Sequence, residues 1–182
     1  GAILPLSTIL ETVKQHPDAS TVELGGGEPF VDPRLVQIIK EIYSMDRSIH
    51  IATAVPVIPS GIMNLPPEIL EKVEIQVSLH ASNPVLYQQI TGRNLFSAVT
   101  QNIRKLKEKY ATSISSTIYS KNVHYVPNII VLARELQVPI RVNLVMPVGK
   151  GALVERVTPQ ELNLIRGTLL QARVMDQSVE SP

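Results

Sequence analysis

The chain has 182 residues, enough for one domain with a sizeable core, and 44% of them are hydrophobic, as in ordinary globular proteins. Its 17 basic and 16 acidic side chains give a formal net charge of +1, and only 4% of its residues are aromatic, so nothing indicates a nucleic-acid-binding surface. No apolar stretch approaches the roughly 18 residues needed to span a membrane. The absence of cysteine excludes disulfides and cysteine-bound metals within these residues.

Strand-like and helix-like patterns alternate along the chain. Period-two alternation over 73–79 is typical of a strand, and Thr158-Pro159-Gln160-Glu161 is a capping box that opens a helix. Strands are expected at 21–24, 48–53, 73–79, 113–118 and 140–146. Helices are expected at about 6–16, 35–42, 67–70, 96–106, 127–136 and 158–173. Helical crossovers between strands imply a parallel sheet, so the fold class is α/β.

Five strand–helix units fall short of a closed eight-stranded barrel, so we expect a partial barrel or an open α/β sheet. We treat residues 1–182 as a single domain, with a core at about 20–151. In both architectures ligands bind at the carboxyl ends of the strands. The residues that follow each strand are therefore the candidates for a site.

The first strand end carries three glycines, a glutamate and a proline. The glycines let the backbone approach a ligand closely and adopt positive φ angles. The Glu28 carboxylate would repel a phosphate, so a ligand with an ammonium group fits better. A glycine triplet taken alone favours the alternative of a tight turn with a solvated glutamate.

Two further strand ends carry polar residues. Ser78 and His80 project to the same side and can hydrogen-bond ligand hydroxyls, or else they are a strand-end serine and a capping histidine. Arg141 and Asn143 lie in an otherwise apolar strand and should face a polar interior. A salt bridge from Arg141 to a glutamate of another strand is the alternative.

Six motifs follow one another in register with these strands: 24–30, 51–54, 77–81, 90–93, 116–118 and 147–151. This series resembles the radical SAM superfamily, whose members use S-adenosylmethionine (SAM) and a [4Fe-4S] cluster. The resemblance covers the chain from about Ser20 to Gly151. It implies a partial TIM-like (β/α) barrel of parallel strands, here without its first strand.

The resemblance also implies roles for individual residues. Gly26, Gly27 and Glu28 match the Gly-Gly-Glu motif that binds the amino group of SAM, and Pro29 matches the proline that commonly follows. Thr53 matches a threonine that often precedes Asn-Gly, although the next two residues differ here.

The later strand ends match positions that contact the rest of SAM. Ser78 and His80 match residues that hydrogen-bond the ribose or the carboxylate. The resemblance places four more residues near the adenine, the ribose or the carboxylate: Thr117, Asn122, Arg141 and Met146.

The chain departs from the family because the three-cysteine motif that holds the cluster is absent. The first strand and the cluster loop would lie upstream of Gly1, so truncation is the simplest account. The resemblance implies cleavage of SAM to a 5′-deoxyadenosyl radical in the full-length enzyme, whereas this chain alone is expected to be inactive and free of iron. A cluster-less binding module of the same fold and an unrelated partial-barrel enzyme, such as an aldolase, remain alternatives.

The partners are left open by the sequence. The substrate could be a small molecule, a peptide or a protein, and we expect a cytoplasmic location with no membrane contact. If a first strand is missing, the strand at 21–24 has a bare edge, which favours self-association.

Overall fold

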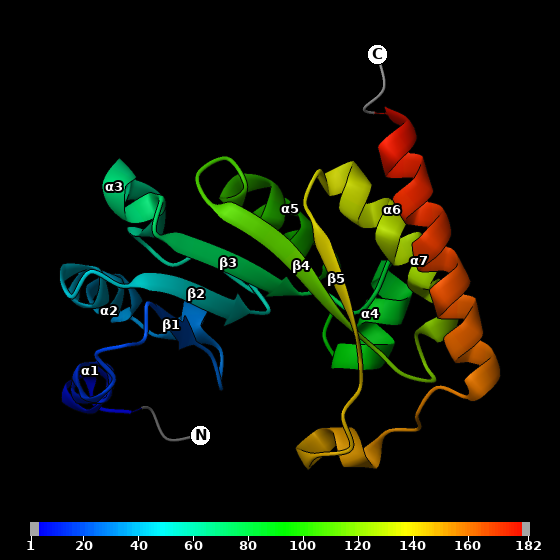
Figure 1. Cartoon of the computed structure of the whole chain (residues 1–182), viewed down its shortest axis with the longest axis horizontal. Helices are drawn as coiled ribbons and strands as arrows, with labels where there is room; N and C mark the ends of the chain where they lie inside the picture. The colour runs from blue at the N-terminus through cyan, green and yellow to red at the C-terminus, as the bar shows by residue number, and fades with distance from the viewer. Residues whose placement is uncertain (1–3, 180–182) are drawn as a thin grey trace. The chain divides into compact units, whose positions relative to one another are not determined.

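The computed structural model describes residues 4–179, in which five strands alternate with helices (Figure 1). The strands are β1 (Thr21–Leu24), β2 (Ser48–Thr53), β3 (Val73–Ser78), β4 (Ala111–Ile118) and β5 (Ile140–Leu144). The α-helices are α1 (Leu6–Gln15), α2 (Leu35–Ser44), α3 (Pro67–Leu70), α4 (Pro84–Thr91), α5 (Phe96–Leu106), α6 (Val126–Leu136) and α7 (Pro159–Val179). Short 3-10 helices are η1 (Pro29–Val31), η2 (Ile62–Asn64), η3 (Val123–Tyr125) and η4 (Gly149–Leu153).

The strands form one sheet in the order β1-β2-β3-β4-β5. The pairs β1–β2, β2–β3 and β4–β5 are parallel, and Glu23, His50 and Glu74 lie in one register row. The predicted α/β class with an open sheet of parallel strands is therefore confirmed.

The chain divides into two compact units, which are described separately below. Unit 1 comprises Gly1–Ser78 and Ser97–Ser113, and unit 2 comprises Leu79–Phe96 and Ile114–Pro182. Unit 1 thus holds β1, β2 and β3 with α1, α2, α3 and α5, whereas unit 2 holds α4, α6, α7 and β5. The strand β4 begins in unit 1 and continues into unit 2.

The core of unit 1 forms because each strand buries one of its two faces. Along β2, buried Ile49, Ile51 and Thr53 alternate with half-buried residues, as a strand with one covered face requires. The helix α2 contributes an apolar stripe that includes Ile39 and Ile42, both fully buried. This arrangement leaves the other sheet face to polar side chains such as Glu74 and Gln76.

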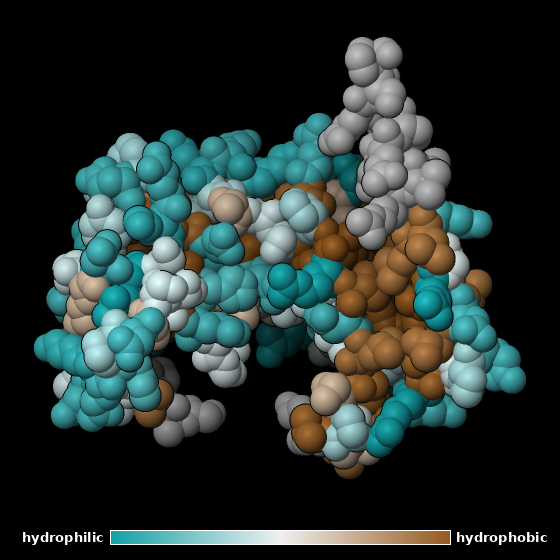
Figure 2. All heavy atoms as spheres, viewed as in Figure 1, coloured by the Kyte–Doolittle hydropathy of each residue, from teal (hydrophilic) through white to brown (hydrophobic). Residues whose placement is uncertain are grey.

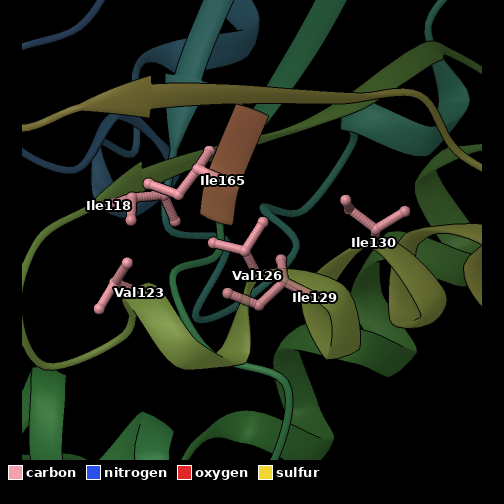
Figure 3. Packing of buried hydrophobic residues seen from close by; sticks show 6 residues of the cluster. All are labelled: Ile118, Val123, Val126, Ile129, Ile130 and Ile165. Carbon is pink, nitrogen blue, oxygen red and sulfur yellow. The ribbon is translucent and has the colours of Figure 1, made fainter. Parts of the chain in front are cut away.

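The core of unit 2 is a cluster around the start of α6 (Figure 3). Val123 from η3 and Val126 from α6 are both 1% exposed, and Ile118 at the end of β4 is fully buried. Ile165 brings α7 into this cluster. The predicted capping box at the start of α7 is confirmed, because the Glu161 carboxylate accepts from the Thr158 amide at 2.7 Å and the Thr158 hydroxyl accepts from the Glu161 amide at 3.2 Å.

One helix, α4, was missed at the sequence level. It has only two buried residues, Leu86 and Tyr87, so it shows no extended apolar stripe. Its ends nevertheless carry ordinary signals: the Asn83 side chain accepts from the Leu86 amide at 2.9 Å, and Gly92 ends the helix with a φ of 70°.

Two features stand out on the surface of the described residues: the outer edge of β1 and an exposed apolar area in unit 2. Within the sheet order, β1 has β2 as its one strand neighbour, so the expected bare edge is present and self-association through it remains a prediction. In unit 2, hydrophobic side chains gather over β5 and α7 (Figure 2), and Leu144 of β5 and Leu170 of α7 are exposed. No helix within residues 4–179 combines the length and apolarity needed to cross a membrane.

Candidate functional site

The Glu28 carboxylate follows the end of β1 and accepts three hydrogen bonds. Its Oε1 accepts from the Phe30 amide at 3.0 Å and from the Thr53 hydroxyl at 2.5 Å. Its Oε2 accepts from the Ala54 amide at 2.8 Å. Three neutral donors therefore fix both oxygens, and in the part of the chain that the structure describes no cation is paired with Glu28. The group is a preorganised anion with lone pairs left for a cationic ligand.

The local sequence explains how Glu28 reaches this position. Gly26 has a φ of 97°, which a residue with a Cβ adopts only with strain. Glu28 caps η1, Pro29 occupies the first position of that helix, and Phe30 is buried at 2% exposure. The Phe30 side chain therefore anchors the turn in the core while the Glu28 carboxylate points back to the end of β2.

The reason for a glycine at position 27 differs from the reason at position 26. A Cβ built at this position would meet nothing within 4 Å, so no packing in unit 1 demands a glycine here. The backbone at Gly27 is therefore left accessible beside the Glu28 carboxylate, as close approach of a ligand requires.

The loop after β2 supplies the remaining residues around the Glu28 carboxylate. Thr53 is 2% exposed, and its hydroxyl oxygen accepts from the Val55 amide at 2.8 Å while donating to Glu28. Val55 is fully buried and has a φ of 44°, in the left-handed region. The Asn102 side chain, from α5, donates to the Val55 carbonyl at 3.0 Å. We call Glu28, Thr53, Ala54, Val55 and Asn102 the Glu28 network.

A second polar group lies in unit 2 around His80. The His80 Nδ1 accepts from the Thr117 amide at 3.0 Å, so its proton lies on Nε2. Asn122 is fully buried and donates to the carbonyls of His80 and Thr117, each at 2.9 Å, while its Oδ1 accepts from the Tyr119 amide at 2.9 Å. His80 thus presents an Nε2–H donor. The hydrogen bonds donated by Asn122 hold the backbone of His80 and Thr117 in place.

The remaining candidate residues are less constrained. Ser78 is half-buried at the end of β3, and Arg141 is exposed on β5 beside Ser115 of β4. Asn143 donates to the Ser115 hydroxyl at 3.0 Å. Met146, which follows β5, is 67% exposed. Arg141 and Asn143 are thus exposed on β5, whereas Ser78 ends β3 and Met146 follows β5.

Neither group is arranged to hold a metal. Within the described residues, no set of three or more histidine, aspartate and glutamate side chains could bind a metal ion. An iron–sulfur cluster needs thiolate ligands, and the 182 residues include no cysteine, so this chain does not fit that group.

The protonation of His80 gives a testable prediction. Burial lowers the pKa of His80 below its usual value near 6.5, because the charged imidazolium loses hydration. Protonation would also turn Nδ1 into a donor facing the Thr117 amide. The unfolded chain therefore binds a proton at a higher pH than the folded chain does, and stability is lost as pH falls below about 6.5.

We expect the melting temperature to fall between about pH 7.5 and about pH 5.5, and to fall less in His80→Asn, whose Oδ1 can accept from the Thr117 amide. His16→Asn, at an exposed histidine of unit 1, is the control and should keep the wild-type slope. Equal slopes in wild type and His80→Asn would contradict this assignment.

The chain is similar in structure to several solved proteins. Streptococcus suis SuiB bound to S-adenosylmethionine matches with a TM-score of 0.79 and 14% identity, over 99% of this chain and 42% of that one. Native anSMEcpe with bound AdoMet matches with a TM-score of 0.72 and 14% identity, over 93% and 51% of the two chains. TYW1 with a lysine-pyruvate adduct matches with a TM-score of 0.62 and 16% identity, over 88% and 58%.

This chain has the fold of the radical SAM enzymes. The predicted resemblance is thereby confirmed at the level of fold. The chain spans less than two thirds of the length of each of these structures. No protein-family model matches the chain, and no curated protein sequence does.

The sequence named Glu28 and Thr53 of the Glu28 network as candidate site residues, but not Ala54, Val55 or Asn102, and Asn102 gave the weakest signal. Asn102 lies in α5, far from any strand end, and is separated from Val55 by 47 residues in the sequence. An asparagine among polar helix residues gives no signal of a long-range contact, so the structure alone reveals it.

Proposed function

We propose that this chain is the SAM-binding part of a radical SAM enzyme, with Glu28 as the acceptor for the ammonium group of SAM. The single observation that carries this proposal is the carboxylate fixed by three donors beside the accessible backbone of Gly27. A carboxylate held in this way binds an ammonium through a charge-assisted hydrogen bond, about twice as strong as a neutral one. The fold shared with SAM-bound SuiB and anSMEcpe supports the choice of ligand.

The residues of this chain would bind and orient SAM. In unit 1, Gly26 supplies the turn, Pro29 occupies the first position of η1, and the Thr53 hydroxyl donates to the Glu28 carboxylate. In unit 2, His80 offers its Nε2–H donor, and Asn122 acts as a positioning residue for His80. Ser78, Thr117, Arg141 and Met146 keep the roles that the resemblance implies.

Radical formation lies outside what this chain can do alone. A [4Fe-4S] cluster would supply the electron that cleaves SAM, and its thiolate ligands are absent from these residues. The similar structures hold different molecules, since SuiB is solved with its precursor peptide SuiA and TYW1 with a lysine-pyruvate adduct. The shared fold therefore does not select a substrate.

The proposal is tested by titrating SAM into the isotope-labelled chain and following backbone amide signals by NMR. We expect shifts at Gly27, Glu28 and Ala54, with an affinity in the millimolar range, on the order of −4 kcal/mol. The affinity is weak because a few hydrogen bonds, each worth about 0.5–1.5 kcal/mol, oppose an association cost of at least about 4 kcal/mol.

Two control ligands sharpen this test. Methionine carries the ammonium and should shift the same unit 1 signals, whereas adenosine lacks it and should not. If saturating SAM leaves the signals of Gly27, Glu28 and Ala54 in place, the proposed function is wrong for this site.

A further inference from the structure

The loop after β2 contains a backbone conformation that its sequence disfavours. Val55 has a φ of 44°, in the left-handed region where the Cβ of an L-residue crowds the backbone, and a β-branched residue there is a clear outlier. Val55 is also fully buried and precedes Pro56, which restricts it further. Such a conformation persists only where neighbouring groups hold it in place.

Two side chains hold Val55 in this conformation. Its amide donates to the Thr53 hydroxyl oxygen at 2.8 Å, and its carbonyl accepts from the Asn102 side chain at 3.0 Å. Both backbone polar groups of this buried residue are thus satisfied by side chains, which buried groups need in the absence of strand or helix partners. Asn102 is the one long-range contact of the two, because it lies on α5.

The conformation of Val55 also affects the hydrogen bonds that the Glu28 carboxylate accepts. The Val55 amide donates to the Thr53 oxygen and so helps to orient this hydroxyl, whose single hydrogen is donated to Glu28. The Ala54 amide, which donates to Glu28 at 2.8 Å, lies in the peptide bond between Thr53 and Ala54, and Val55 is the next residue. A change at Val55 therefore reaches two of the three donors that fix the Glu28 carboxylate.

We propose that Asn102 is a positioning residue for the Glu28 site. It acts through the Val55 carbonyl: it holds the left-handed turn, which aims the Thr53 hydroxyl and the Ala54 amide at Glu28. Its relevance to SAM rests on the proposed function, whereas the positioning itself is a property of unit 1 that can be measured without any ligand.

The test is amide hydrogen exchange in Asn102→Leu, which removes the donor and keeps a side chain of similar size. We expect exchange at Val55 and Ala54 to accelerate at least about tenfold, since opening of this loop no longer breaks the Asn102 bond. Gln101→Leu, at the exposed neighbouring position of α5, is the matched control and should leave both amides at wild-type rates. Unchanged exchange at both amides in Asn102→Leu, or equal acceleration at every amide of unit 1, would overturn the proposal.

A double-variant cycle tests whether Asn102 acts through the left-handed turn at Val55. Glycine adopts the left-handed region without strain, so in a Val55→Gly background the replacement of Asn102 should accelerate Ala54 exchange less than about threefold. A full tenfold effect in that background would show that Asn102 does not act through the strained turn.

The effect of Asn102 on SAM binding is measured in a separate titration. Asn102→Leu should reduce the SAM-induced signal shifts at Glu28 and Ala54, while Gln101→Leu should not. A wild-type chain that fails to respond to SAM removes the proposed function but leaves the exchange result to decide the role of Asn102.

Discussion

Replacing Asn122 with alanine is expected to lower the free energy of unfolding by about 3 kcal/mol. The substitution removes one side chain that serves three backbone groups: the carbonyls of His80 and Thr117 and the amide of Tyr119. A buried polar group left without a partner costs about 1–3 kcal/mol. The expected loss of stability lies at the lower end of the summed cost for these three groups. His80 and Thr117 are only partly buried, so water can replace part of the lost hydrogen bonding.

Chemical denaturation at neutral pH measures this effect. Asn128→Ala, at an exposed asparagine of α6, is the matched control and should change stability by less than about 0.5 kcal/mol. A loss below about 1 kcal/mol in Asn122→Ala would mean that the network around His80 is not maintained in solution.

The same substitution tests whether Asn122 positions His80. With Asn122 gone, the strand end that carries His80 loses its bond to the loop before η3, and the Thr117 amide no longer has a fixed partner. We therefore expect the acid sensitivity attributed to His80 to diminish in Asn122→Ala, in parallel with the loss of stability.

The overall fold could be predicted from the sequence because its signals are local and repeated. Four of the five predicted strands begin at the residue where the structure begins them, and the remaining one, β4, starts at Ala111 instead of Ser113. Alternating apolar residues mark buried strand faces, and the capping box at Thr158 marks the start of α7. The helix α4 was not predicted, because it buries only two side chains and so lacks a periodic apolar stripe.

The candidate site was predictable only in part, for a physical reason. Glycines followed by glutamate at a strand end mark a turn that presents a carboxylate, and the structure places Glu28 there. The partners of Glu28 come from the end of β2, and the anchor of that loop comes from α5. The left-handed turn at Val55 gave no sequence signal either, since its amide donates to Thr53 and its carbonyl accepts from the distant Asn102.

Replacing Glu28 with alanine is expected to weaken SAM binding by roughly 10- to 100-fold, which converts to about 1.5–3 kcal/mol, the range for a hydrogen bond to a charged group. From a millimolar starting affinity, the signal shifts at Gly27 and Ala54 should then vanish at any practical SAM concentration. Glu108→Ala removes the same charge at an exposed site of unit 1 and is the matched control. It should leave the titration unchanged apart from a small screened electrostatic effect.

Glu28→Gln separates the charge of Glu28 from its role in the loop. Glutamine keeps one acceptor oxygen for the Phe30 amide and the Thr53 hydroxyl, but its NH₂ group would face the Ala54 amide, where two donors cannot pair. We expect Glu28→Gln to weaken SAM binding about as much as Glu28→Ala does, because both lose the negative charge that an ammonium requires. If Glu28→Gln binds SAM as wild type does, the carboxylate serves only to hold the turn, and the ammonium of SAM must be bound elsewhere.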